Sequence, residues 1–202
     1  TCALPIFRRA TKEWGIILGV FGILYFTGLH TEVIGGLQRV LLSTGILRPN
    51  TEVDPSDIRK ASFNMPLITL DGDRTSLEQF EGKTIFLNFW ATWCAPCVTE
   101  MPSLDKLAVR LHTKGLIVVA VSQDLNELSK VKSFLKPMML KEIVIWYDEK
   151  NKGFRELGLR GLPTTILINP DGLIVAKLEG SAEWNEGPLL AQIEEIIKND
   201  SS

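Results

Sequence analysis

The stretch FLNFWATWCAPCVTEMPSL, residues 86–104, decides the fold of this chain. It continues an apolar run, TIFLNFW at 84–90, that is typical of a strand buried on both faces. Cys94 and Cys97 follow directly, and a helix is predicted over residues 95–112. A C-x-x-C motif between a buried strand and a helix indicates a redox dithiol.

The position of Cys94 at the start of this helix gives its thiol a chemical advantage. We expect Cys94 to cap the helix and Pro96 to lie in the first turn, where proline's missing N–H costs nothing. The unpaired N–H groups and the positive end of the helix dipole stabilise a thiolate there. Lowering a thiol pKa from about 8.5 to about 7 raises its ionised fraction at neutral pH from about 3% to about half. Lower basicity removes part of this gain, but it also makes Cys94 a better leaving group.

Two other interpretations of the cysteine pair remain open at this point. A structural disulfide closing so short a loop would stabilise the fold by only about 2 kcal/mol. A zinc site needs four ligands, and neither of the two histidines, His30 and His112, stands beside the pair. We therefore expect no metal at Cys94 and Cys97.

The composition excludes several other classes of protein. The chain has 202 residues, 22 basic and 24 acidic, with a formal net charge of −2, whereas a nucleic-acid-binding protein should be basic. Apolar residues make up 45% and charged residues 23%, which is close to the globular average. Three cysteines are too few for a disulfide-stapled mini-domain. The composition therefore predicts one globular domain with an appendage.

Strands and helices alternate along the globular part of the chain. The apolar runs predict strands at 67–70, 84–90, 117–122 and 142–147, helices after Ser76 and over 95–112, 125–135 and 150–157, a hairpin over 164–180, and an amphipathic carboxyl-terminal helix that carries Leu189, Leu190, Ile193, Ile196 and Ile197. This order predicts an α/β fold with a mixed central sheet and helices on both faces.

The amino-terminal residues read as a membrane anchor. Residues 14–29, WGIILGVFGILYFTGL, carry no charge, and a few more residues extend the helix toward the bilayer thickness. A cleaved signal peptide and a buried core helix are the alternatives, but no convincing cleavage site follows. Arg8, Arg9 and Lys12 precede the segment, so the positive-inside rule leaves the amino terminus in the cytoplasm.

This topology divides the chain into four parts. Residues 1–13 are the expected cytoplasmic amino terminus, and residues 14–30 form a single transmembrane helix. Residues 31–60 contain an amphipathic segment and a polar, proline-bounded linker, and residues 61–202 form the exported globular domain. The amphipathic segment could lie on the outer membrane surface or pack against the domain.

Two motifs together resemble the membrane-anchored TlpA/ResA-like reductases of the thioredoxin superfamily. They are residues 86–104, quoted above, and GLPTTILINPDG at 161–172. The resemblance runs from about Asn64 to Lys198 and implies a thioredoxin-like fold for residues 61–202. It implies that Cys94 attacks and that Cys97 resolves, through a redox-active Cys94–Cys97 disulfide.

The resemblance also assigns roles around the dithiol. Pro163 falls where the family has a cis-proline facing the two cysteines, and the backbone of Leu162 would then pair with an extended substrate segment. Trp93 and Pro96 are expected to contact substrate, although Trp93 could instead pack in the core. No cofactor is implied.

Glu100 matches an acidic position of the ResA-like branch. Glu100 follows Cys97 by three residues, so on a helix the two side chains lie on the same face. Glu100 could therefore take or relay the proton of the Cys97 thiol. The alternative is an ordinary solvated helix charge. Asn88 stands where cytosolic thioredoxins carry a buried aspartate, and it cannot titrate, which makes Glu100 more important.

The resemblance therefore implies a thiol-disulfide oxidoreductase that reduces disulfides of exported proteins, such as apocytochrome c, on the outer face of the cytoplasmic membrane. A membrane thiol protein would have to supply electrons, because the exported compartment lacks the cytosolic reducing pool. Two alternatives stay open: a peroxiredoxin-like peroxide reductase, and a non-catalytic copper carrier on the same fold.

Overall fold

The computed structural model describes residues 60–125, 127–148 and 150–200 of the chain. Their elements are β1 (Leu67–Thr69), β2 (Arg74–Thr75), η2 (Leu77–Phe80), β3 (Thr84–Trp90), α3 (Ala95–Leu111), η3 (His112–Lys114), β4 (Leu116–Ser122), α4 (Leu128–Leu135), η4 (Lys136–Met138), β5 (Val144–Tyr147), α5 (Lys152–Glu156), β6 (Thr164–Ile168), β7 (Ile174–Glu179) and α6 (Gly187–Asp200).

The seven strands form one mixed sheet in the order β2-β1-β5-β4-β3-β6-β7. The strands β3, β4 and β5 are parallel, whereas β6 runs antiparallel to β3 and β7 antiparallel to β6. All seven residues of β3 are buried, which confirms the prediction from its apolar run. Because β6 is antiparallel to β3, the carboxyl end of β3 adjoins the start of β6, and Phe89 pairs with Thr164.

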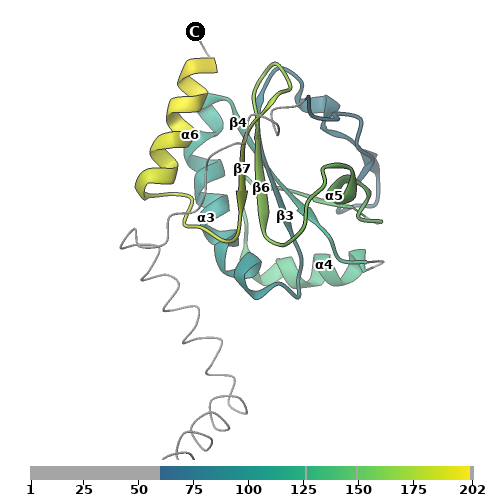
Figure 1. Cartoon of the computed structure of the whole chain (residues 1–202). Helices are drawn as coiled ribbons and strands as arrows, with labels where there is room; N and C mark the ends of the chain where they lie inside the picture. Colours follow the sequence, from purple (N-terminus) through teal and green to yellow (C-terminus); the bar gives the residue numbers. More distant parts are fainter. Residues whose placement is uncertain (1–59, 126, 149, 201–202) are drawn as a thin grey trace, which may run out of the picture. The chain divides into compact units, whose positions relative to one another are not determined.

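Helices cover both faces of this sheet. Helices α3 and α6 lie together on one face, and α5 lies on the other (Figure 1). Phe86 and Trp90 point into the core beneath α3, while Leu87 and Phe89 point into the core beneath α5. This alternation with period two places Asn88 on the α3 face, together with Phe86 and Trp90.

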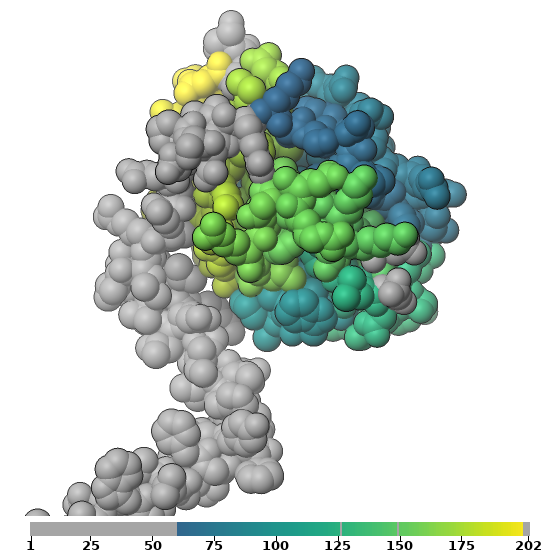
Figure 2. All heavy atoms as spheres, turned by 45° about the vertical axis from the view of Figure 1, so that its right-hand side comes forward, coloured from purple at the N-terminus to yellow at the C-terminus, as the bar shows by residue number. Residues whose placement is uncertain are grey.

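Helix α5 packs closely against Met65, which lies near the start of the described domain. A side chain on Gly153 in α5 would meet the sulfur of Met65, so the Met65 side chain would have to move to make room. In the space-filling view, the green segment that includes α5 lies beside the dark blue residues that precede β3 (Figure 2).

Several predicted boundaries differ from the structure. The helix predicted over 125–135 begins only at Leu128, and the one predicted over 150–157 shortens to Lys152–Glu156. The turn after Ser76 is a short 3-10 helix, and the two-residue strand β2 was not predicted. These segments are too short for a periodic pattern to mark their ends.

The anchor predicted at residues 14–30 and the segment at 31–59 lie outside the described residues. Among the residues that are described, no helix is both long and apolar enough to cross a bilayer.

Candidate active site

Strand β3 and helix α3 bring the two cysteines to the carboxyl edge of the sheet. The chain leaves β3 at Trp90, and the N–H of Cys94 donates to the carbonyl of Ala91 at 3.1 Å, which closes a tight turn. Cys94 then caps α3, and its carbonyl accepts the first helical bond from Val98. The first turn of α3 holds no acidic residue, so nothing there opposes the positive end of the helix dipole.

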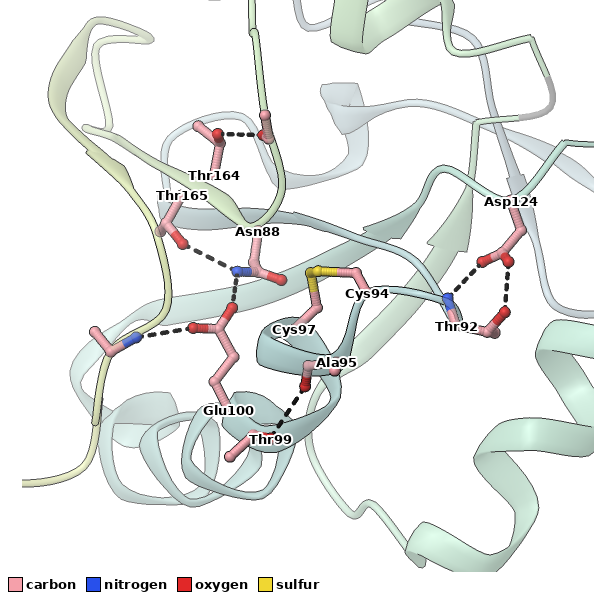
Figure 3. The surroundings of a disulfide bond; sticks show 12 residues. Asn88, Thr92, Cys94, Ala95, Cys97, Thr99, Glu100, Asp124, Thr164 and Thr165 are labelled. Carbon is pink, nitrogen blue, oxygen red and sulfur yellow. Dashed lines mark hydrogen bonds between the residues drawn. A yellow bond between two sulfur atoms is a disulfide. The ribbon is translucent and has the colours of Figure 1, made fainter. Parts of the chain in front are cut away.

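Asp124 holds this turn from the neighbouring strand. Its carboxylate accepts hydrogen bonds from the backbone N–H of Thr92 at 3.0 Å and from the Thr92 hydroxyl at 2.6 Å (Figure 3). The hydroxyl of Ser122 donates to the same carboxylate at 2.8 Å. Asp124 was missed from the sequence, although it lies only two residues after the end of the buried strand β4. The ends of parallel strands meet at one sheet edge, and that position was the available signal.

The two cysteines form a disulfide, with their Cα atoms 5.3 Å apart. Cys94 retains 5% of its accessible surface and Cys97 retains none, as expected for a cap residue and a residue one turn inside the helix. Trp93 is 67% exposed, so it does not pack in the core. Pro96 is also exposed, beside the pair.

The loop before β6 lies at the end of β3, the strand that leads to the dithiol. The Leu162–Pro163 peptide bond is cis, as the resemblance implied. Because Thr164 pairs with Phe89, Pro163 lies one step further along, opposite the end of β3. Pro163 is buried, whereas Leu162 is half-buried. The carbonyl of Pro163 accepts a hydrogen bond from Gly180 at 2.9 Å, which ties the loop to the end of β7.

Glu100 is buried, with 3% of its surface exposed, so the alternative of a solvated helix charge is wrong. Its carboxylate accepts three hydrogen bonds: from Asn88 Nδ2 at 2.9 Å, from the backbone of Ala182 at 3.1 Å, and from Trp184 Nε1 at 3.0 Å. Burial raises the pKa of Glu100 from 4.5 to about 7, although these three bonds act in the opposite direction. Glu100 can therefore exchange a proton near neutral pH.

Trp184 donates a hydrogen bond to Glu100, a role that the sequence analysis missed. It packs edge-on against Phe86, with ring centroids 4.8 Å apart. Its indole N–H also donates to Glu100, 84 positions earlier in the chain. Only the tertiary fold brings the two residues together, so no local pattern could have shown the contact.

Asn88 lies between Glu100 and the disulfide (Figure 3). The side chain is fully buried, and its amide nitrogen donates to Glu100 and, at 3.0 Å, to the hydroxyl of Thr165. Asn88 therefore links the acid on α3 to the strand that follows Pro163. Within the part of the chain that the structure describes, no cluster of histidine, cysteine and acidic side chains could hold a metal ion.

The sequence of the chain is similar to those of known proteins. The model of the Redoxin family matches residues 54–193 of the chain. The thiol-disulfide oxidoreductase ResA of Bacillus subtilis is 33% identical over 174 residues, which span 86% of this chain and 87% of that protein.

Solved structures show the same likeness. A candidate thiol:disulfide interchange protein DsbE from Chlorobium tepidum is 26% identical, with a TM-score of 0.62, over 69% of this chain and 99% of that one. The exposed lipoprotein thioredoxin Etrx1 of Streptococcus pneumoniae is 25% identical, with a TM-score of 0.56, over 64% of this chain and 97% of that one. The chain thus belongs to the Redoxin family and, within the thioredoxin superfamily, to the ResA-like thiol-disulfide oxidoreductases.

Proposed function

We propose that this oxidoreductase reduces disulfide bonds of exported proteins through Cys94 and Cys97. The observation that carries the proposal is the asymmetry of the pair. Cys94 caps a helix beneath the exposed Trp93, where a partner protein can approach, while Cys97 is fully buried on the side of Glu100. Such an arrangement separates the attack on a substrate from the later release of the product.

The first step is the attack of the Cys94 thiolate on a substrate disulfide. A new bond forms between the Cys94 sulfur and one substrate sulfur, and the other substrate sulfur leaves as a thiolate that takes a proton from solvent. The free N–H groups at the start of α3 stabilise the attacking thiolate. Asp124 accepts two hydrogen bonds from Thr92, which keeps the turn before Cys94 in place.

The second step is the attack of Cys97 on the mixed disulfide between Cys94 and the substrate. The Cys97 thiol loses a proton and attacks the Cys94 sulfur, which re-forms the Cys94–Cys97 disulfide; the bond between Cys94 and the substrate breaks, and the substrate sulfur leaves as a thiolate that takes a proton from solvent. A buried thiol resists ionisation, because the charged form is poorly solvated. Glu100, whose pKa of about 7 lets it accept a proton at neutral pH, serves as the acceptor on this buried side.

The exposed side chains around Cys94 support a docking surface for a protein substrate. Trp93 is 67% exposed, and Leu125, which follows Asp124 directly, is 59% exposed. Pro96 and the half-buried Leu162 border the same edge of the sheet. We propose that an extended substrate segment pairs with the backbone at Leu162 and packs against Trp93.

We further propose that residues 14–30 anchor the domain on the outer face of the cytoplasmic membrane. The charge pattern of the amino terminus supports this topology. The alignment with ResA of Bacillus subtilis is longer than residues 60–202, so the likeness extends into the amino-terminal part. Apocytochrome c is the proposed substrate, and a membrane thiol protein is the proposed electron donor.

The two alternative functions receive less support. A peroxide reductase of this superfamily would work through a lone peroxidatic cysteine, whereas Cys94 and Cys97 are joined in one disulfide. A copper carrier would need a wider cysteine spacing and a histidine ligand, and neither histidine follows the pair closely in the sequence.

A trapping experiment in membranes tests the proposal. Cys97→Ser leaves Cys94 able to attack but unable to release its partner, so mixed disulfides with exported proteins should accumulate on non-reducing gels. The double variant Cys94→Ser/Cys97→Ser, which also lacks the attacking thiol, should capture nothing. Absence of any Cys94 adduct, or adducts with cytoplasmic proteins alone, would contradict the proposed function.

A further inference from the structure

The amide of Asn88 leaves one buried polar atom unsatisfied next to the reacting sulfurs. The side chain has no exposed surface, and both of its hydrogen-bonding ends are therefore cut off from water. Its Nδ2 makes two bonds, but its Oδ1 has no hydrogen-bond partner among the described residues. Buried polar atoms are rarely left this way, and a functional role is one of the reasons when they are.

The orientation of this amide follows from its neighbours. When Glu100 is ionised, its carboxylate accepts hydrogen bonds and donates none, so the NH2 group of Asn88 then faces Glu100. The second hydrogen of the same group reaches Thr165. Both bonds lie on one side, which directs Oδ1 away from them and toward the Cys94–Cys97 disulfide (Figure 3).

A disulfide has no proton to donate, whereas a thiol does. Oδ1 of Asn88 can therefore gain a partner only when the bond between Cys94 and Cys97 is reduced. Of the two sulfurs, that of Cys97 is the one with no exposed surface and no access to water. Its thiol needs an acceptor inside the protein.

We propose that Asn88 is a positioning residue that accepts a hydrogen bond from the thiol of reduced Cys97. The bond requires a thiol on Cys97 and is absent from the disulfide form, so Asn88 shifts the redox equilibrium toward the reduced form. The inference rests on the proposed cycling of Cys94 and Cys97, because it describes the reduced half of that cycle.

The electrons and protons of this step balance within ordinary thiol-disulfide exchange. A dithiol donor loses two electrons and two protons and becomes a disulfide, while the Cys94–Cys97 bond breaks and both sulfurs become thiols. The proton on Cys97 is the one shared with Asn88. When Cys97 attacks again, that proton leaves on the side where Glu100 lies.

The equilibrium with glutathione measures the effect directly. Asn88→Leu keeps the size of the side chain but removes the acceptor, so the full chain should shift about two- to tenfold toward its disulfide form, the range for a single hydrogen bond. Thr165→Val is the matched control, because it removes a partner of Nδ2 and leaves Oδ1 in place, and its equilibrium should match that of the parent protein. An equal shift in both variants, or none in Asn88→Leu, would overturn the proposal.

Infrared spectroscopy provides a second test that needs no turnover. With Cys2→Ser and Cys94→Ser, Cys97 carries the one remaining thiol of the chain. Its S–H stretching band should lie at lower frequency with Asn88 present than with Asn88→Leu, because the hydrogen bond weakens the S–H bond. Asn88→Ala repeats the comparison should the leucine variant not fold.

The two measurements separate this inference from the proposed function. A merely structural role for Asn88 would change the unfolding temperature and leave the S–H band in place, which would overturn the inference. A band shift together with failed trapping of exported partners would support Asn88 and contradict the proposed substrate class instead.

Discussion

The surroundings of Cys94 and Cys97 differ far more than their separation of three residues suggests. On the Cys94 side, the turn is held by the Thr92–Asp124 contact, and Trp93 stands exposed in solvent. On the Cys97 side, the cysteine has no exposed surface, and the buried amide of Asn88 nearby donates a hydrogen bond to the buried carboxylate of Glu100.

This difference shows how one short motif can serve two chemical steps. A thiol at the surface can exchange its proton with water, so its environment needs only to fix the backbone and favour the thiolate. A thiol in the interior has no such access, and its proton must go to a group that titrates near neutral pH. The predictions below alter one side while leaving the other intact.

Substitution of the cysteines has the largest expected effect. Cys94→Ser should reduce the catalysed reduction of insulin by dithiothreitol to the background rate, because a serine hydroxyl is not ionised at neutral pH. Cys97→Ser should also abolish turnover but still consume one equivalent of a peptide disulfide, measured by mass spectrometry. One equivalent consumed by Cys94→Ser instead would reverse the assignment of the two sides.

Glu100→Gln should remove a pH dependence of stability. Folded Glu100 keeps its proton up to about pH 7, whereas the unfolded chain releases it near 4.5, so the free energy of unfolding should fall by about 3 kcal/mol as the pH rises across this interval. Denaturant titrations of the parent protein and the variant measure the difference. Titration of Glu100 should also give the rate of disulfide exchange an inflection near pH 7 in the parent protein. This inflection should be absent in Glu100→Gln.

A nearby exposed acid provides the control for Glu100. Glu183 precedes Trp184 in the chain and is exposed, so Glu183→Gln should keep the pH dependence of the parent protein. If Glu100→Gln and the parent protein lose stability in parallel as the pH rises, Glu100 is not the titrating group.

Asp124→Asn should weaken the Cys94 side alone. The amide places an NH2 group against donors from Thr92 and Ser122, so the free energy of unfolding should decrease by about 1–3 kcal/mol, measured by denaturant titration. Exchange should slow because the turn before Cys94 loosens, while the pH dependence assigned to Glu100 stays. A variant that loses this pH dependence as well would show that the two sides are coupled.

Trp93→Ala has the smallest expected effect on stability. The indole is 67% exposed, so the free energy of unfolding should change by no more than about 0.5 kcal/mol. The KM for a protein disulfide should rise several-fold, while the reaction with dithiothreitol, which has no surface to dock, should keep its rate. Equal losses with both substrates would remove Trp93 from the docking surface.

The sequence was most informative where the physical signal is local. The apolar run at 84–90 predicted a fully buried strand, and the cap position of Cys94 followed from the C-x-x-C spacing and Pro96; the structure confirms both. The cis bond before Pro163 came from the resemblance alone, and it is also confirmed.

The rest depends on contacts between distant parts of the chain. Glu100 was singled out, but two of the hydrogen bonds to its carboxylate come from Ala182 and Trp184, which lie 82 and 84 positions away. Asp124 carries no motif of its own, because its role exists only when β4 lies beside β3. The side of the site that binds protons is therefore tertiary in origin, whereas the attacking cysteine is placed by local structure.

The indole of Trp184 gives this domain an optical readout of its own chemistry. Its N–H contacts the carboxylate of Glu100, so a change of charge on that group alters the electric field across the ring. The emission maximum of Trp184 should therefore move with the protonation of the buried acid, provided that the other tryptophans are replaced by phenylalanine. Stopped-flow fluorescence could then follow the proton during a single catalytic cycle.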